Sequence, residues 1–143
     1  MHELDAGPLY SRIAEIILYG LGPLDKPTLL YATVEEGAIG VTIAEDRGNY
    51  IFFHRLPLAD STDLVDTLVE IWRLRREGER FAEMSFLIAD GRFHASLFYP
   101  DLLDPTEDPF DRSFRVIAEH FGSKPAQCDP IPDNPDEGYS FRL

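Results

Sequence analysis

This sequence contains a single cysteine, Cys128, among its 143 residues. One thiol excludes a disulfide within the chain and fits a reducing compartment. No apolar run approaches the roughly 20 residues that a membrane-spanning helix needs. Residues 1–5 include two acids, Glu3 and Asp5, and do not resemble a charged-then-apolar leader. We therefore expect a soluble, cytoplasmic protein with no membrane partner.

Basic residues are also scarce. The chain has 13 Lys and Arg against 26 Asp and Glu, which gives a formal net charge of -13. A charge of this size argues against nucleic acid or an anionic membrane surface as a ligand, because like charges repel. It favours a basic protein partner and would speed the approach of that partner. Solubility alone is an equally simple explanation of the same composition.

The patterns that usually mark an active site are missing from the sequence. The glycines fall in predicted turns and helix ends rather than in a phosphate-binding loop. The four histidines, at positions 2, 54, 94 and 120, show no metal-ligand spacing with one another or with Cys128. His94 shares a predicted hairpin face with Ser85 and Ser96, but no nucleophile elbow accompanies them. We predict a protein that is not an enzyme and uses no metal and no cofactor.

The strongest structural signal is a hairpin at residues 82–99. Asp90-Gly91 suits a two-residue type I′ turn, because both central residues of that turn need positive φ. The turn fixes a register that puts six apolar residues on one face. They are Met84, Phe86, Ile88, Phe93, Ala95 and Leu97. The other face, with Ser85, Ser96 and His94, is expected to be partly wetted.

A second hairpin is predicted around Glu36-Gly37. Leu30, Ala32 and Val34 alternate before this turn, and Ile39, Val41 and Ile43 alternate after it. A loop at residues 45–49 then leads to a third strand at 50–55. That strand is apolar on both faces, so we expect it in the middle of the sheet, and Pro57 ends it.

Helical spacing of apolar residues predicts three helices, at residues 9–19, 61–77 and 110–121. The second has Asp60 or Ser61 as its cap, acids near its start and arginines near its end, which matches the helix dipole. Its apolar stripe is Leu64, Leu68, Ile71 and Trp72. The stripe of the third helix is Phe110, Phe114, Ile117 and Phe121, and Gly122 is its predicted stop.

The order α-β-β-β-α-β-β-α indicates an α+β fold. We expect an antiparallel sheet of about five strands, built from two hairpin units, with helices packed on one face. Residues 1–122 would form a single domain. Residues 123–143 are rich in proline and acid and predict an extended, poorly packed tail, in which residues 139–141 can still dock as a short strand.

The candidate partner-binding surface is acidic. Carboxylates are dense between the second hairpin and the third helix, but prolines interrupt them and their spacing does not match a calcium loop. A purely solvated loop would have the same composition. The candidate residues are Asp101, Asp104, Glu107, Asp108 and Asp111, together with Glu45 and Asp46.

The run of residues 81–99, followed by Tyr99-Pro100-Asp101, resembles the central hairpin of YezG-like immunity proteins. In that family an aromatic residue precedes an alternating strand, a turn ending in Gly, a basic residue with Phe, and an aromatic-rich strand leading to a Tyr-x-Asp step. The element order over residues 9–121, including Tyr31 in an early strand and Arg112 in a late segment, is similar to the family.

The resemblance implies an antitoxin that is not an enzyme and that binds a toxin domain, often a nuclease, and blocks its active site. The net charge of -13 independently fits a basic partner of this kind. The alternative is an acidic adaptor or chaperone-like domain that binds another protein through its sheet. An aromatic-rich sheet face is also compatible with a homodimer.

Overall fold

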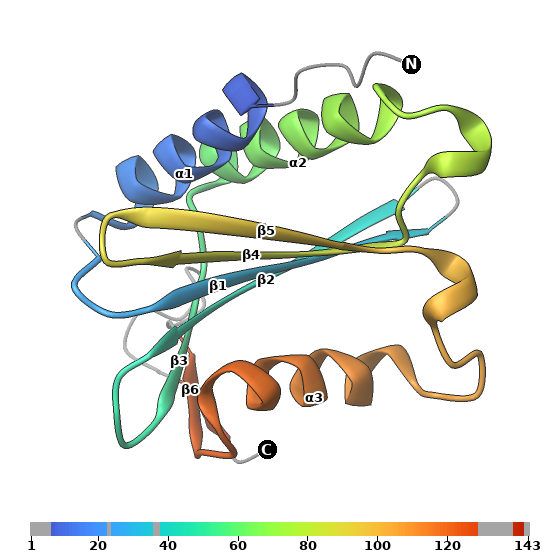
Figure 1. The fold of residues 1–143 in the computed structure, drawn as a ribbon. Helices are drawn as coiled ribbons and strands as arrows, with labels where there is room; N and C mark the ends of the chain where they lie inside the picture. The colour runs from blue at the N-terminus through green and yellow to red at the C-terminus, as the bar shows by residue number, and fades with distance from the viewer. Residues whose placement is uncertain (1–6, 23, 36–37, 129–138, 142–143) are drawn as a thin grey trace.

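The computed structural model describes residues 7–22, 24–35, 38–128 and 139–141, and it has three layers (Figure 1). A seven-stranded sheet in the order β5-β4-β1-β2-β3-β6-β7 forms the middle layer. The strands are β1 (Thr28–Glu35), β2 (Ala38–Asp46), β3 (Ile51–His54), β4 (Glu83–Ala89), β5 (Arg92–Phe98), β6 (Ala126–Cys128) and β7 (Tyr139–Phe141). The helices are α1 (Gly7–Leu21), α2 (Leu58–Arg73) and α3 (Pro109–Phe121), with short 3-10 turns η1 (Glu77–Glu79) and η2 (Pro100–Leu102).

The fold is α+β, and the predicted order of three helices and the first five strands is confirmed. Every pair of neighbouring strands in the described sheet is antiparallel except β3 and β6, which are parallel. Helices α1 and α2 pack on one face of the sheet, as predicted. Helix α3 adds a second layer on the opposite face (Figure 1).

Both hairpin registers are confirmed. Asp90 and Gly91 have φ of 54° and 71°, the left-handed values that a type I′ turn requires. The β4–β5 ladder runs from Ala89 opposite Arg92 to Met84 opposite Leu97, as the turn dictates. The same agreement holds in the first hairpin, where the β1–β2 ladder pairs residues 30, 32 and 34 with 43, 41 and 39.

The two hairpins join through a pairing that is distant in the sequence. Strand β1 lies antiparallel to β4, with Tyr31 opposite Ser85 and Leu30 opposite Phe86. Helix α2 makes the connection from β3 back to β4 across one face. The third strand therefore lies inside the sheet, between β2 and β6, as predicted.

Each face of the sheet has its own apolar core. On the face of α1 and α2, the core consists of Leu30, Ala32, Ile43, Met84, Phe86 and Ile88 from the sheet with Ile13, Ile17, Leu64, Leu68 and Ile71 from the helices. On the other face, it consists of Leu29, Tyr31, Ala44 and Ile51 with Val116 and Ile117 of α3. Because α3 covers this second face, Ser85 is only 2% exposed, although the sequence suggested a wetted surface there.

Helix ends differ from the predicted ones where the cap chemistry was misread. Helix α2 starts at Leu58 after Pro57, and neither Asp60 nor Ser61 caps it. It ends at Arg73, four residues earlier than predicted. Helix α3 stops at Gly122, which has a φ of 84°, as predicted, and Asp108 is its N-cap.

Strands β2 and β6 also correct the sequence reading. Strand β2 continues to Asp46, so Glu45 and Asp46 belong to a strand rather than to a loop. Beyond residue 122, β6 pairs with β3 and buries Ala126. Strand β7 pairs with β6, so residues 139–141 do dock as a short strand. These strands show that part of the 123–143 segment belongs to the sheet, while residues 129–138 lie outside the described residues.

Candidate partner-binding surface

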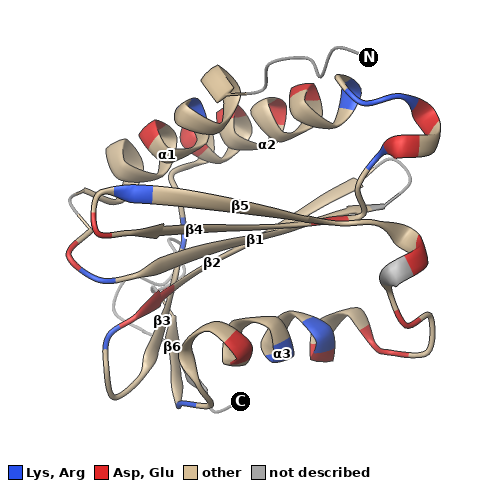
Figure 2. Ribbon diagram, in the orientation of Figure 1, with Lys and Arg blue, Asp and Glu red and all other residues tan. Residues whose placement is uncertain are grey.

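The seven predicted acidic residues fall into two groups that the fold keeps apart. Five of them surround the start of α3, whereas Glu45 and Asp46 lie at the end of β2 near the other end of that helix (Figure 2). A helix of 13 residues is about 20 Å long. The structure therefore does not bring the two groups together into one acidic patch.

Glu45 and Asp46 are already paired within the chain. The Glu45 carboxylate is buried and lies 2.7 Å from Arg47 Nε and 2.9 Å from His54 Nε2. Burial alone would raise the pKa of Glu45, but the hydrogen bonds from His54 and Arg47 outweigh it and lower the pKa. Lys124 Nζ donates to Asp46 Oδ1 at 2.6 Å. Both acids therefore serve the fold and offer little free charge to a partner.

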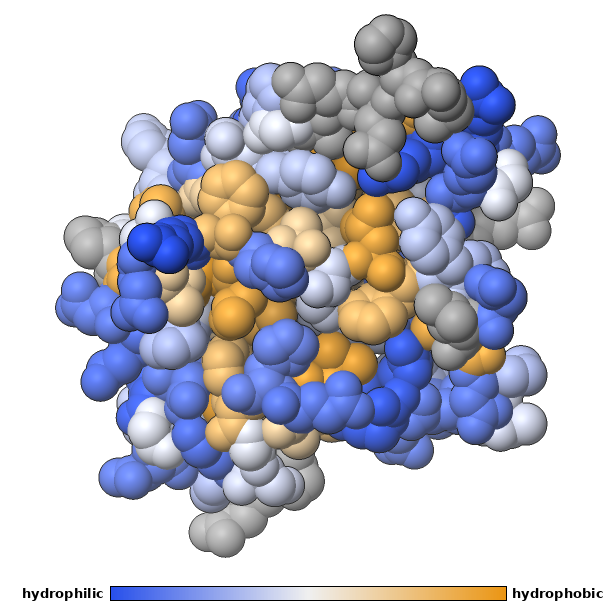
Figure 3. All heavy atoms as spheres, viewed as in Figure 1, coloured by the Kyte–Doolittle hydropathy of each residue, from blue (hydrophilic) through white to orange (hydrophobic). Residues whose placement is uncertain are grey.

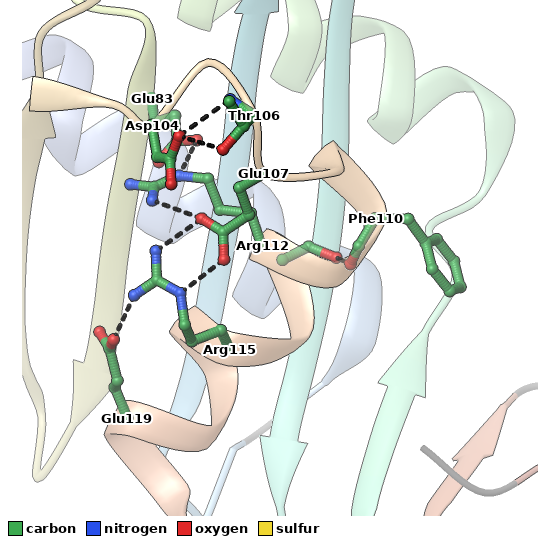
Figure 4. A network of polar contacts seen from close by, with 9 residues as sticks. Glu83, Asp104, Thr106, Glu107, Phe110, Arg112, Arg115 and Glu119 are labelled. Carbon is green, nitrogen blue, oxygen red and sulfur yellow. Dashed lines mark hydrogen bonds and ion pairs between the residues drawn. The ribbon is translucent and has the colours of Figure 1, made fainter. Parts of the chain in front are cut away.

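Glu107 belongs to an ion-pair network that ties α3 to the sheet (Figure 4). Its carboxylate accepts from Arg115 at 2.8 and 2.9 Å and from Arg112 at 3.2 Å. Arg112 also donates to Glu83 on β4 at 2.5 Å, and Arg115 to Glu119 at 2.5 Å. Mainly because of Arg115, with help from Arg112, the pKa of Glu107 falls from 4.5 to about 2.

Next to this network lies a cluster of buried polar side chains that the sequence did not predict. The Tyr31 hydroxyl, Ser85 Oγ and Glu83 Oε1 are buried without a hydrogen-bond partner in the described structure. Burial, reinforced by the neighbouring Glu83 carboxylate, raises the pKa of the Tyr31 phenol. Tyr31 and Ser85 face each other on adjacent strands, and this pair of polar residues could have indicated the cluster. The sequence alone does not show it, because the pairing of β1 with β4 is needed to recognise the pair.

Asp104 and Asp108 are exposed and held in place by local hydrogen bonds. Asp104 Oδ1 accepts from the backbone nitrogen and hydroxyl of Thr106, and these bonds lower the pKa of Asp104. Asp108 Oδ1 accepts from the Phe110 nitrogen at 2.8 Å and caps α3. Both sets of bonds are made to Oδ1.

Asp101 and Asp111 complete this surface and are also exposed. Asp101 sits in η2, and Asp111 lies in the first turn of α3. We call Asp101, Asp104, Asp108 and Asp111 the α3 acidic rim. Figure 2 shows acidic residues gathered in the loop that leads into α3. Local hydrogen bonds hold two of the four rim carboxylates, those of Asp104 and Asp108, in place before a partner arrives.

Phe110 lies in the first turn of α3, and the sequence pattern wrongly predicted that its side chain is buried. It was expected on the apolar stripe of α3, yet its side chain is 66% exposed. Its ring packs edge-to-face on Phe114, with centroids 4.5 Å apart, and Phe114 in turn packs on Phe53 of β3. Phe110 therefore projects outward on a firm support, away from the Arg112 network (Figure 4). Exposed aromatic residues of this kind often anchor protein interfaces.

No group of three or more His, Cys, Asp or Glu side chains in the described chain is arranged to hold a metal ion. Among the described residues, no helix has the length and apolar character needed to cross a bilayer. Comparison with models of known protein families finds no match to this chain, and no curated protein matches it either.

Proposed function

We propose that this protein is an immunity protein that neutralises a basic toxin domain, of the nuclease type, by binding it through the α3 acidic rim. The observation that carries the proposal is a set of four exposed carboxylates at and before the start of α3, together with an exposed, supported aromatic ring, Phe110, in the first turn of the same helix. The net charge of -13 supports a basic partner. The resemblance of residues 81–101 to YezG-like immunity proteins supports a toxin as that partner.

The geometry supports this function because, among the described residues, no basic side chain forms an ion pair with a carboxylate of the rim. Glu45, Asp46 and Glu107 are neutralised by their own basic partners, whereas Asp101 and Asp111 are exposed acids of the rim. Lysine and arginine side chains of a nuclease surface would meet the rim, and Phe110 would enter an apolar recess beside them. Charges at the rim of an interface mainly raise the association rate, while a buried aromatic slows dissociation.

The test needs a candidate toxin domain, which is sought among the products of the neighbouring genes, purified, and titrated with this protein. The double variant Asp101→Asn/Asp111→Asn should slow association by about tenfold at low salt, because it removes steering charge without removing a cap. Phe110→Ala should instead raise the dissociation rate. Rising salt should weaken binding of the unmodified protein.

The matched control is Asp63→Asn/Asp66→Asn, which removes the same charge from exposed positions on α2. It should change the association rate by less than about twofold. Equal slowing by both double variants would place the effect in the overall charge and remove the rim from the interface. Binding that does not respond to salt would overturn the electrostatic mechanism.

A second candidate function, an adaptor that holds a peptide, is favoured by a groove on the other side of the molecule. A cavity of about 260 Å³ between α2 and the first hairpin is lined by Val34, Ile39, Val65, Val69, Trp72 and their neighbours. Trp72 is the single tryptophan of the chain. Its fluorescence should therefore change when an apolar peptide is titrated in, and an unchanged spectrum with all peptides would exclude this function.

A further inference from the structure

Strand β5 is the terminal strand of the sheet, and its outer edge is free of any described strand. Within the described parts of the chain it pairs with β4 alone, and the view in Figure 1 shows no described element in front of it. Figure 3, from the same side, shows apolar side chains near the middle of this face, with hydrophilic side chains among them. Natural proteins usually protect such an edge with charges, proline or a covering element, because it can pair with another strand.

The outward backbone groups of this edge follow from the hairpin register. With a two-residue turn, Ala89 and Arg92 form a hydrogen-bonded pair, and every second residue of β5 bonds to β4 from there on. Phe93, Ala95 and Leu97 therefore direct their backbone N–H and C=O groups away from β4. These three alternate residues form a short, regular edge on which another strand can dock.

The side chains of this edge lack charge. Residues 93–100 contain no Asp, Glu, Lys or Arg, although 27% of the chain is charged. Phe93 is 42% exposed and its ring stacks on Phe86, with centroids 5.0 Å apart. The uncharged run is bounded by Arg92 at one end and Asp101 at the other. This pattern is self-complementary when the strand is paired with an antiparallel copy of itself.

We propose that two copies of this chain pair through their β5 strands, antiparallel and related by a two-fold axis at Ala95. Phe93 then faces Leu97 of the second copy, and the three outward residues of each strand complete their hydrogen bonds. Arg92 then lies near the C-terminal end of β5 of the second copy, which leads to Asp101 of that copy. The two sheets become one continuous sheet across the interface.

Electrostatics gives this dimer a distinctive response to salt. Each copy carries a net charge of -13, so the two copies repel at long range. Screening this repulsion strengthens the dimer, whereas screening weakens the attraction of a basic toxin domain to the acidic rim. The inference does not depend on the proposed function, and the opposite salt responses distinguish the two.

The test is sedimentation velocity of the full chain at micromolar concentrations in about 50 and 500 mM NaCl. We expect a concentration-dependent dimer that is tighter at the higher salt. Phe93→Glu should raise the dissociation constant by about tenfold or more, because it places two like charges in the interface. Tyr19→Glu is the matched control, since Tyr19 is an 87% exposed aromatic residue on α1, and it should change the constant by less than about twofold.

A charge-swap series keeps the proposal falsifiable if Phe93→Glu affects folding. Arg92→Asp and Asp101→Arg should each weaken the dimer, and the double variant should restore it to within about threefold of the unmodified chain. Recovery in the double variant requires the two residues to meet across copies. A monomer under every condition, or no recovery in the double variant, would overturn the proposal.

Discussion

Arg112 on α3 and Glu83 on β4 form a buried ion pair, with Nε and Oε2 2.5 Å apart. Their side chains are 12% and 4% exposed, and the pair joins the helix to the sheet face that it covers. Removal of one partner leaves the other charge buried and uncompensated, which costs far more than the net contribution of the pair. The docking of α3, and with it the position of the acidic rim, therefore depends on this contact.

Arg112→Met should destabilise the protein by about 3–5 kcal/mol, because Glu83 would remain buried without its partner. Urea unfolding followed by circular dichroism measures the change. Arg115→Met is the matched control: the Arg115 side chain is 46% exposed, so its loss should cost much less than the loss of Arg112. A second substitution, Glu83→Leu, should recover most of the loss caused by Arg112→Met. No recovery would show that Arg112 acts through packing rather than through charge.

Acid should destabilise the protein partly through Glu107. The pKa of this group is lowered to about 2 in the folded state from an ordinary 4.5, so the unfolded state binds more protons between these values. Its stabilising effect is complete above about pH 4.5 and is lost as the pH falls toward 2. Glu107→Gln should therefore flatten the acid limb of the stability profile. Parallel limbs for the two proteins, measured by urea unfolding from neutral to acidic pH, would contradict this assignment.

Gly91→Ala should cost about 1 kcal/mol, because residue 91 has a φ of 71° that a Cβ disfavours. Thermal unfolding measures the loss. Gly78→Ala provides the control, since φ there is not positive and an added Cβ meets nothing within 4 Å. That change should stay within about 0.5 kcal/mol. A similar cost at both positions would argue against strain in the hairpin turn.

Two acids of the rim should differ in their effect on stability. Asp108→Ala removes the N-cap of α3 and should cost about 1 kcal/mol. Asp101→Ala removes an exposed carboxylate and should change the free energy of unfolding by less than about 0.5 kcal/mol. Chemical denaturation of both variants checks the difference. Equal stability would mean that the bond from the Phe110 nitrogen contributes nothing to α3.

The sequence predicted local structure well, because local chemistry determines it. Asp90-Gly91 set the register of β4 against β5, and the same logic paired β1 with β2. The pairing of β1 with β4 could not be predicted in this way, since nothing near either strand specifies a neighbour more than 45 residues away. The burial of Ser85 and the exposure of Phe93 both follow from that pairing and from the placement of α3.

The acidic surface shows the same limit. Composition identified the carboxylates, but it could not tell which of them have basic partners in the fold. Glu45, Asp46 and Glu107 are matched by Arg47, Lys124 and Arg115, and only the assembled sheet and α3 bring the Asp46 and Lys124 side chains together. Phe110 was misassigned because helical spacing alone does not show how much of a helix face its neighbours cover.

The parallel pairing of β3 with β6 has a consequence for synthesis of the chain. Strand β3 ends at His54, while β6 begins at Ala126, so 72 positions separate the two partners. At a translation rate of roughly 5–20 residues per second, the side of β3 that receives β6 waits about 4–14 s for its partner. A ribosome-bound nascent chain therefore carries an open hydrogen-bonding edge at β3 that the finished protein covers.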